Sequence, residues 1–409
     1  MPSTRSSNVA ARLENVGDRR KGAEAHFPAD RMQELPDKFR RYFPITERYV
    51  YLNHASVSPL SSAARDCMVK VLDGSMLCGS RIWEEMERRQ TASRSRAAQL
   101  VNAKPHQIAF LRNTSEAISA IANGIQWRSG DNIVTTAAEF PANVYPWRRV
   151  ACEHGVDMRI ANGVDSHMVD LEELLALADE RTRVVALSWV QFATGQRLDI
   201  QRAGKFCRER GILFVVDAVQ GLGALELDVE RDFVDAFAAG AHKFLLGPKG
   251  ISILYLSDQA LQQIAPTVIG WTAVKDHGDY LVHDLDFRDG AIRFEGGTAN
   301  VAGICGLGEA IDLLLQAGPA DIERHVLSLS AYLISGLEKK GYQVTSATAP
   351  AEISAIVTCL HQRYSAAEVC SHLEGRNIIT SARCRGLRIA PHFYNTQADL
   401  DALLEELPQ

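Results

Sequence analysis

Residues 211–217, GILFVVD, decide the fold class of this chain. The apolar residues Ile212–Val216 run without a break up to Asp217, which is typical of a parallel strand buried on both faces. Amphipathic helix patterns, such as Ser115–Trp127 with isoleucines along one stripe, alternate with similar apolar runs. Those runs lie at Ile108–Leu111, Asn132–Thr135, Arg183–Val190 and Ile251–Leu256. Alternating strands and helices predict an α/β fold with a mostly parallel sheet.

The order of these patterns predicts three regions. Residues 1–48 lack sustained periodicity apart from a short amphipathic segment at Met32–Phe43, so we expect a loosely ordered N-terminal arm. Residues 49–310 hold the alternating pattern and form the large α/β domain. Residues 311–409 continue a long helix into a short strand near 353–358 and then helix–strand–helix, which predicts a small α+β domain.

Composition excludes several classes of function. The 409 residues include 44 Lys and Arg against 50 Asp and Glu, a net charge of -6. Such a charge offers no electrostatic surface for a nucleic acid or an anionic membrane. No apolar run approaches the roughly 20 residues needed to span a bilayer, and the N-terminus lacks the apolar core of a secretory signal. We therefore expect a cytoplasmic protein that binds neither nucleic acid nor membrane, with its eight cysteines reduced.

Two charged residues follow the buried runs at places where chemistry is expected. Asp217 stands at the carboxyl end of a strand, where ligands collect in parallel sheets, although a turn or helix-capping aspartate is an alternative. Lys243 lies in the apolar segment AHKFLLGPKG, residues 241–250, and burial makes a lysine amine a nucleophile. The alternative for Lys243 is an ion-paired loop residue.

A pyridoxal phosphate (PLP) site requires this pair, because the cofactor needs a lysine for its aldehyde and an acid for its pyridine nitrogen. It also requires a phosphate cradle. Residues 113–116, NTSE, follow a strand and open a helix, where free N–H groups and hydroxyls suit an anion; an ordinary helix cap is the alternative. The sequence therefore predicts a PLP site. The acidic segment 276–286 has no known metal-ligand spacing, so no metal is expected.

Together these stretches resemble the class V aminotransferase family of fold-type I PLP enzymes, which includes cysteine desulfurases and isopenicillin N epimerase-like proteins. The resemblance covers about nine-tenths of the chain, from Tyr51 onward, and implies a large domain with a seven-stranded type of sheet. The matching motifs are Tyr51–Pro59, Arg112–Glu116, Asp217–Gln220, Ala241–Gly250, Arg293–Asn300 and Arg388–Thr396.

The resemblance also implies a role for each matching site residue. Lys243 would form the internal aldimine and Asp217 would pair with the pyridine nitrogen. Arg388 would grip the substrate α-carboxylate through two hydrogen bonds. A homodimer is implied, because Thr298 would reach the phosphate bound by the neighbouring subunit. The remaining implied contacts are Gln220 to the phenolic oxygen, Thr114, Ser115 and His242 to the phosphate, and Asn53 and Ala55 to the substrate.

Three positions depart from the desulfurase pattern. Phe140 stands where desulfurases have a histidine that stacks on the cofactor and moves protons; a phenyl ring can stack but carries no proton. Phe192 replaces an asparagine, and Gly240 replaces a phosphate-binding serine of many relatives. The two phenylalanines favour the isopenicillin N epimerase-like branch.

We therefore expect an enzyme that acts at the α-carbon of an amino acid through an external aldimine, with Lys243 as acid and base. Transamination, epimerisation and elimination share this chemistry and stay open. The alternative is sulfur chemistry by a C–S lyase or desulfurase, and a second is a PLP-binding protein without turnover, for which a substrate arginine would have little use. Cys384, four positions before Arg388, would be the desulfurase nucleophile, but so short a segment has little reach.

Overall fold

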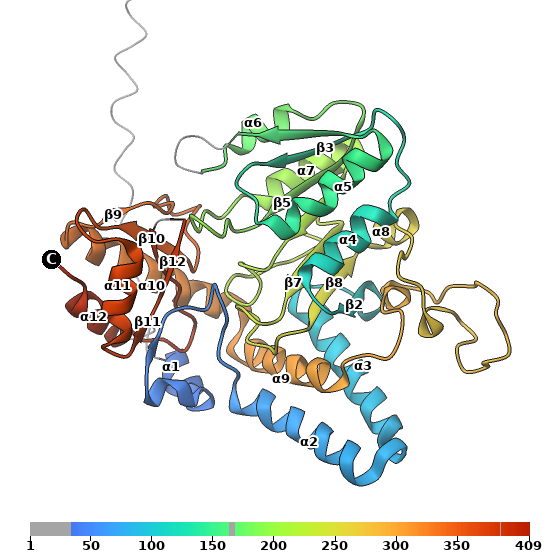
Figure 1. The fold of residues 1–409 in the computed structure, drawn as a ribbon, viewed down its shortest axis with the longest axis horizontal. Helices are drawn as coiled ribbons and strands as arrows, with labels where there is room; N and C mark the ends of the chain where they lie inside the picture. The colour runs from blue at the N-terminus through green and yellow to red at the C-terminus, as the bar shows by residue number, and fades with distance from the viewer. Residues whose placement is uncertain (1–33, 163–167, 385) are drawn as a thin grey trace, which may run out of the picture.

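A computed structural model describes residues 34–162, 168–384 and 386–409 of the chain (Figure 1). Its centre is a seven-stranded sheet in the order β2-β8-β7-β6-β5-β3-β4. Neighbouring strands from β7 to β4 are parallel, whereas β8 runs antiparallel to both β7 and β2. The strands are β2 (Ile108–Leu111), β3 (Asn132–Thr136), β4 (Asp157–Ala161), β5 (Thr182–Ser188), β6 (Leu213–Asp217), β7 (Ala236–Gly240) and β8 (Ser252–Leu256). The predicted α/β fold with a mostly parallel sheet is confirmed.

Alternate residues of each strand enter two hydrophobic cores, one on each face of the sheet. On one face Leu213 and Val215 pack in the same core as residues of α4 (Thr114–Gly124), α5 (Tyr145–His154) and α8 (Asp258–Gln263). On the other, Phe214 and Val216 share a core with α3 (Trp83–Leu100), α6 (Leu171–Ala176), α7 (Ile200–Arg210) and α9 (Val301–Ala317). Coverage on both faces explains why the strand sequences are apolar without alternation.

Helix α9 packs against the long hairpin of α2 (Ser62–Cys78) and α3 (Figure 1). No single helix in the described ranges is long and apolar enough to cross a membrane; α9 and α10 (Pro319–Lys339) meet such a test only as a pair bent by 80°.

The C-terminal part of the chain forms a separate four-stranded antiparallel sheet, in the order β12-β13-β10-β9. Its elements are β9 (Gln343–Val344), β10 (Val357–Leu360), α11 (Ala366–Glu374), β11 (Ile378–Ile379), β12 (Ser381–Arg383), β13 (Gly386–Ile389) and α12 (Gln397–Glu406). The strand expected near 353–358 is therefore displaced and begins at Val357. Strand β11 pairs outside this sheet, in parallel with β1 (Val50–Tyr51).

Because buried residues of α9 as far as Ala317 belong to the core of the seven-stranded sheet, we propose Gly318 rather than residue 310 as the domain boundary. Residues before 34 of the expected N-terminal arm lie outside the described residues. Within the arm, α1 (Glu34–Phe39) and the turns after it pack onto the C-terminal region. Phe43 stacks on Tyr394 with ring centroids 3.9 Å apart, and Arg40 pairs with Asp399 at 2.6 Å. This stretch is thus a packed part of the fold.

Candidate active site

A cavity of about 400 Å³ lies at the carboxyl ends of the parallel strands. Strands β5 and β6 end side by side at Ser188 and Asp217, which face each other in register and both line the cavity. The loop after β7 brings Lys243, and β13 brings Arg388 from the C-terminal region. Lys243 and Arg388 follow Asp217 by 26 and 171 positions in the sequence, and all three line the same cavity.

Asp217 is a buried carboxylate at the end of β6. One of its oxygens accepts a hydrogen bond from the backbone N–H of Val219 at 3.0 Å. Burial raises the pKa of Asp217, while this hydrogen bond and the charge of Lys243 oppose the rise. A buried carboxylate with few donors favours a cationic N–H partner, as a protonated pyridine nitrogen would provide.

Lys243 lies in the loop between β7 and β8, among the buried residues Phe244, Leu245 and Leu246. Burial lowers the pKa of its amine to about 8, with help from the charges of Arg388 and Arg383, against the opposing charge of Asp217. A lowered pKa gives the amine a substantial neutral fraction near pH 7, which is the form that attacks an aldehyde.

A residue of the Arg388–Thr396 motif forms a hydrogen bond with the backbone of the loop that contains Lys243. The ring Nε2–H of His392 donates to the carbonyl oxygen of Phe244 at 2.8 Å, and Asn395 accepts from the backbone N–H of His392. Burial lowers the pKa of His392 well below its ordinary value, so the ring is neutral. His392 is thus a structural residue that holds the backbone beside Lys243.

The start of α4 suits a phosphate group. Asn113 caps the helix by accepting from the backbone N–H of Glu116 at 2.9 Å, and Thr114 and Ser115 line the cavity. At Gly240 a Cβ would lie 2.9 Å from Thr114 Oγ1 and 3.3 Å from the ring of His242, so a side chain there would fill the cradle. Helix N–H groups, hydroxyls and a histidine around an open space are the donors that a phosphate requires.

Gln220 adds a further polar group to the same wall. Its side-chain amide donates to the carbonyl oxygen of Ala55 at 3.2 Å, and its Oε1 is buried without a partner among the described residues. A buried oxygen without a partner is suited to a hydrogen bond from a ligand. With Asp217, Lys243 and the cradle at Thr114 and Ser115, the cavity therefore contains the types of residue that PLP requires, close to one another.

Arg388 is buried, with 2% of its surface exposed, and reaches the cavity from β13. Its guanidinium donates to Ser56 Oγ at 2.7 Å, to the carbonyl oxygen of Phe192 at 3.1 Å and to Ser381 Oγ at 3.3 Å. Burial lowers its pKa to about 10, and no carboxylate pairs with it in the described part of the chain. A buried cation held only by neutral groups is suited to bind an anion such as a carboxylate.

The structure also shows a carboxylate that the sequence analysis did not single out. Glu139 is buried and accepts hydrogen bonds from the backbone N–H of Ser188 at 2.6 Å, from the Ser188 hydroxyl and from Asn143 at 2.9 Å. Burial, with a smaller contribution from Asp217, raises the pKa of Glu139 to about 7. Glu139 therefore holds Ser188 against the cavity. The sequence could have indicated Glu139, because this residue lies shortly after the end of a buried strand, β3, just as Asp217 lies at the end of β6.

Phe140 and Phe192 meet edge to face at one side of the cavity, with ring centroids 5.2 Å apart. The Phe140 ring is 43% exposed and lies 5.5 Å from Lys243 Nζ. Ala55 lines the cavity as expected, but Asn53 does not; the side-chain oxygen of Asn53 is buried without a partner among the described residues.

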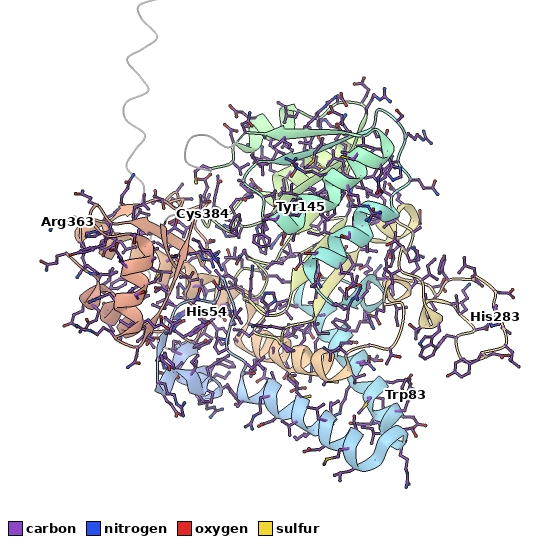
Figure 2. The ribbon with its side chains drawn as sticks, in the orientation of Figure 1. His54, Trp83, Tyr145, His283, Arg363 and Cys384 are labelled. Atoms are coloured by element: carbon purple, nitrogen blue, oxygen red, sulfur yellow. The ribbon has the colours of Figure 1, made fainter. Side chains whose placement is uncertain are left out.

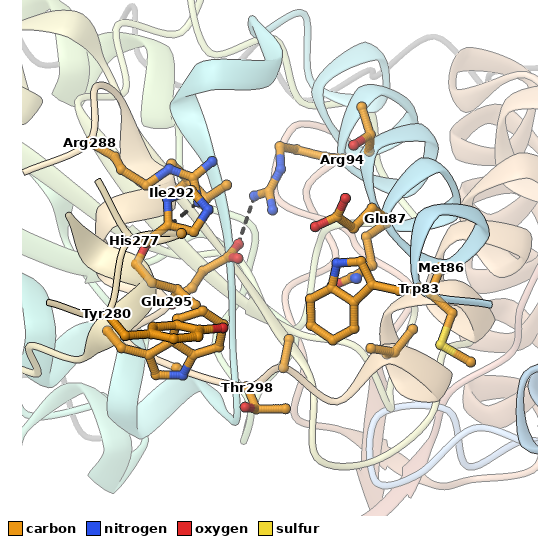
Figure 3. A pocket seen from close by; sticks show the side chains of 18 residues that line it. Trp83, Met86, Glu87, Arg94, His277, Tyr280, Arg288, Ile292, Glu295 and Thr298 are labelled. Carbon is orange, nitrogen blue, oxygen red and sulfur yellow. Dashed lines mark hydrogen bonds and ion pairs between the residues drawn. The ribbon is translucent and has the colours of Figure 1, made fainter. Parts of the chain in front are cut away.

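Thr298 lies away from this cavity, in a different hollow drawn in Figure 3. There it shares the lining with Trp83, Tyr280 and the Arg94–Glu295 ion pair, whose atoms are 2.7 Å apart. The chain therefore brings its other expected phosphate ligands, Thr114, Ser115 and His242, to one site without Thr298.

Cys384 is exposed at the turn between β12 and β13, on the side of the C-terminal region that faces the seven-stranded sheet (Figure 2). It lines a neighbouring cavity of about 690 Å³ and is not part of the lining of the Lys243 cavity. The neighbouring Arg385 lies outside the described residues.

The chain is similar to several known proteins. The family model described as Aminotransferase class-V matches residues 69–403. A probable cysteine desulfurase of Methanothermobacter thermautotrophicus is 28% identical over 396 residues, which cover 90% of this chain and 96% of that protein. A structure of C-DES with glycine covalently linked to PLP has a TM-score of 0.83 at 23% identity, covering 90% of this chain and 98% of that one. A complex of the cystine C–S lyase C-DES with cysteine persulfide has a TM-score of 0.81 at 22% identity, covering 89% and 98%.

Proposed function

Because the chain belongs to the class V aminotransferase family of PLP-dependent enzymes, we propose that it cleaves a C–S bond of an α-amino acid by β-elimination. PLP, the cofactor expected from the sequence, is the cofactor of this family. From the sequence we expected chemistry at Cα, with transamination, epimerisation and elimination left open, and gave a C–S lyase or desulfurase as the alternative. The name of the desulfurase relative supports this alternative, sulfur chemistry, better.

The observation that carries the proposal is the convergence of Lys243, Asp217 and Arg388 on one cavity of about 400 Å³. Bound there, PLP would supply an aldehyde for the substrate amino group and a ring that accepts the electron pair released at Cα. Asp217 would accept a hydrogen bond from the ring N–H. Arg388 would hold the α-carboxylate, which fixes the position of the Cα–H bond relative to Lys243.

Lys243 is the base that the cavity offers for the Cα proton. Its nitrogen would take that proton, and the C–S electron pair would leave with the sulfur as a thiolate, which is then protonated. Hydrolysis of the remaining three-carbon unit gives pyruvate and ammonium. Phe140 supplies an apolar ring without a titratable proton, so we assign the transfer of the Cα proton to Lys243.

The position of Cys384 favours elimination over desulfuration. A desulfurase needs a thiolate at the substrate sulfur. Here the thiol lies outside the Lys243 cavity, and β13 is tied to the cavity wall through Arg388. Elimination needs no protein thiol, because the sulfur leaves with its own substituent.

We also propose a cytoplasmic homodimer that completes the site. Exposed apolar side chains line the hollow that contains Thr298: Trp83 is 52% exposed and Tyr280 is 74% exposed, and Leu281, which follows Tyr280 in the chain, is 90% exposed. Large apolar side chains with this much exposure are typical of a protein interface. A second copy on this face would bury these side chains and bring Thr298 toward the phosphate cradle of its partner.

The test identifies the products that form when the holoenzyme is incubated with S-substituted L-cysteines. We expect pyruvate and the released thiol, without dependence on an added keto acid and without the D-enantiomer. Lys243→Ala should lose this activity by orders of magnitude. In the wild type, borohydride should fix the cofactor to Lys243, as mass spectrometry of the peptide would report. Amino-group transfer to a keto acid, or racemised substrate without pyruvate, would refute the elimination.

A further inference from the structure

A second arginine lies at the Lys243 cavity. Arg383, the last residue of β12, lines this cavity together with Arg388 and is solvent exposed. Arg388 is already assigned to the α-carboxylate by the proposed function. The amino and carboxylate groups that all α-amino acids share therefore leave Arg383 without an assigned partner.

The β12–β13 hairpin directs Arg383 to the same side as Arg388. Ser381 pairs with Arg388 across the hairpin, and its Oγ accepts a hydrogen bond from Arg388 Nε at 3.3 Å. Arg383 is two positions after Ser381, so the two side chains leave the same face of the strand. The residue opposite Arg383 is Gly386, which has no side chain that could bind or cover the guanidinium.

The described lining of the cavity has more cationic than anionic side chains. Among these described residues are the cations Lys243, Arg383 and Arg388 but only one carboxylate, Asp217, which is assigned to the cofactor ring. Arg383 forms no ion pair and donates no side-chain hydrogen bond to any described residue. Two guanidiniums on one wall repel each other, and a ligand with two anionic groups would relieve that repulsion.

Arg383 is also the residue that lines both the Lys243 cavity and the neighbouring cavity of about 690 Å³. That second cavity has hydroxyl groups from Thr345, Ser346 and Thr358. Its described carboxylate, Glu352, accepts a hydrogen bond from Gln196 at 3.2 Å and forms no ion pair with Arg383. A substituent that extends past Arg383 would therefore find space and hydrogen-bonding groups.

We propose that Arg383 selects substrates whose side chain carries a second anionic group, which it binds while Arg388 binds the α-carboxylate. The inference rests on the proposed function for the role of Arg388. It narrows the substrate class to acidic α-amino acids, including cysteines whose sulfur substituent ends in a carboxylate.

The experiment uses matched pairs of ligands that differ in charge. S-carboxymethyl-L-cysteine and S-carbamoylmethyl-L-cysteine form a long pair, and L-aspartate and L-asparagine form a short pair that tests the distance of the anion from Cα. Binding to the holoenzyme is followed by the change in cofactor absorbance, and pyruvate release is measured for the long pair. We expect the anionic member of at least one pair to bind about tenfold more tightly, the effect of one exposed charge-assisted hydrogen bond.

Variants assign the preference to Arg383. Arg383→Gln should bring the ratio within a pair close to one, and Arg383→Lys should keep most of it. Arg363→Gln, on the opposite side of the C-terminal region (Figure 2), is the matched control and should leave the ratio unchanged. Equal binding of both members by the wild type, or a preference that persists in Arg383→Gln, would overturn the inference. A preference in binding without pyruvate release would support it and refute only the elimination.

Discussion

The reactivity of Lys243 is a property of the charges around it. Burial and two arginines lower the pKa of its amine, and Asp217 opposes them. In the described part of the chain, Arg388 donates hydrogen bonds only to neutral groups, and the Arg383 side chain forms no hydrogen bond. The residues that we propose bind an anionic substrate therefore also lower the pKa of the lysine, because both effects come from uncompensated positive charge.

The pH dependence of cofactor capture tests this arrangement. The neutral amine reacts, so the rate of PLP attachment to the cofactor-free protein should rise with pH to a midpoint of about 8, well below the 10.5 of an ordinary lysine. Arg388→Gln removes a neighbouring cation and should move the midpoint up. Asp217→Asn removes the opposing anion and should move it down. Stopped-flow absorbance, with a free lysine derivative as reference, measures these shifts; a wild-type midpoint near 10.5 would contradict the explanation.

The role of Cys384 is a second question at the residue scale. Since its thiol lies outside the Lys243 cavity, we expect Cys384→Ser to leave turnover of a C–S substrate within a few-fold of the wild type. Steady-state kinetics and mass spectrometry of the intact protein provide the measurement. A loss of a hundredfold, roughly 2.7 kcal/mol of transition-state stabilisation, together with a persulfide on Cys384, would instead support desulfuration.

At the scale of elements, the site is assembled from strand ends. The parallel strands β5, β6 and β7 end at Ser188, Asp217 and Gly240, so their carboxyl ends lie next to one another. The ends at Ser188 and Asp217 are well positioned because β5 and β6 are each hydrogen-bonded to a strand on both sides. The first turn of α4 faces Gly240, so an apolar side chain at this position would take up space between Thr114 and His242.

Substitution of that glycine tests the cradle. In Gly240→Val the new side chain would meet Thr114 Oγ1, since even a Cβ would approach it to 2.9 Å. We expect PLP affinity to fall by about tenfold or more, through displaced donors and strain. Gly375→Val, in the C-terminal region, is the matched control, because Gly375 is exposed and a Cβ there would make only an ordinary contact, 3.4 Å from the carbonyl oxygen of His372. Fluorescence titration of the cofactor-free proteins gives both constants, and equal affinities would reject the cradle at Gly240.

At the scale of the whole molecule, exposed apolar side chains occur near Thr298, the residue that we expect to reach the phosphate bound by a partner subunit. Leu281 and Leu285 are 90% and 65% exposed in the segment before Thr298. Exposed aliphatic side chains in such number cost solvation free energy unless another surface covers them. A homodimer would account for the exposed side chains and for the position of Thr298 with one contact.

The oligomeric state provides the corresponding test. The wild type should sediment as a dimer, whereas Leu281→Asp combined with Leu285→Asp should shift it toward the monomer and weaken PLP retention. Tyr364→Asp, an exposed aromatic of the C-terminal region, should leave both unchanged. A fully active wild-type monomer would exclude the shared site.

What the sequence by itself determined was local. The apolar run before Asp217, the apolar surroundings of Lys243 and the cap residues before α4 all depend on neighbours within a few positions, and so could be recognised without a structure. The α/β fold class followed from the same short-range periodicity, because strands buried on both faces show it directly.

Only the tertiary structure decided the direction of β8, the support of Arg388 and the position of Arg383. Strand direction leaves no trace in a continuous apolar run. Ser56, which binds the Arg388 guanidinium, is 332 positions away in the chain. Arg383 faces the cavity because of the register of the β12–β13 hairpin and the lack of a side chain at Gly386. These contacts depend on how distant elements pack, and packing energy is shared among many residues rather than encoded in any one segment.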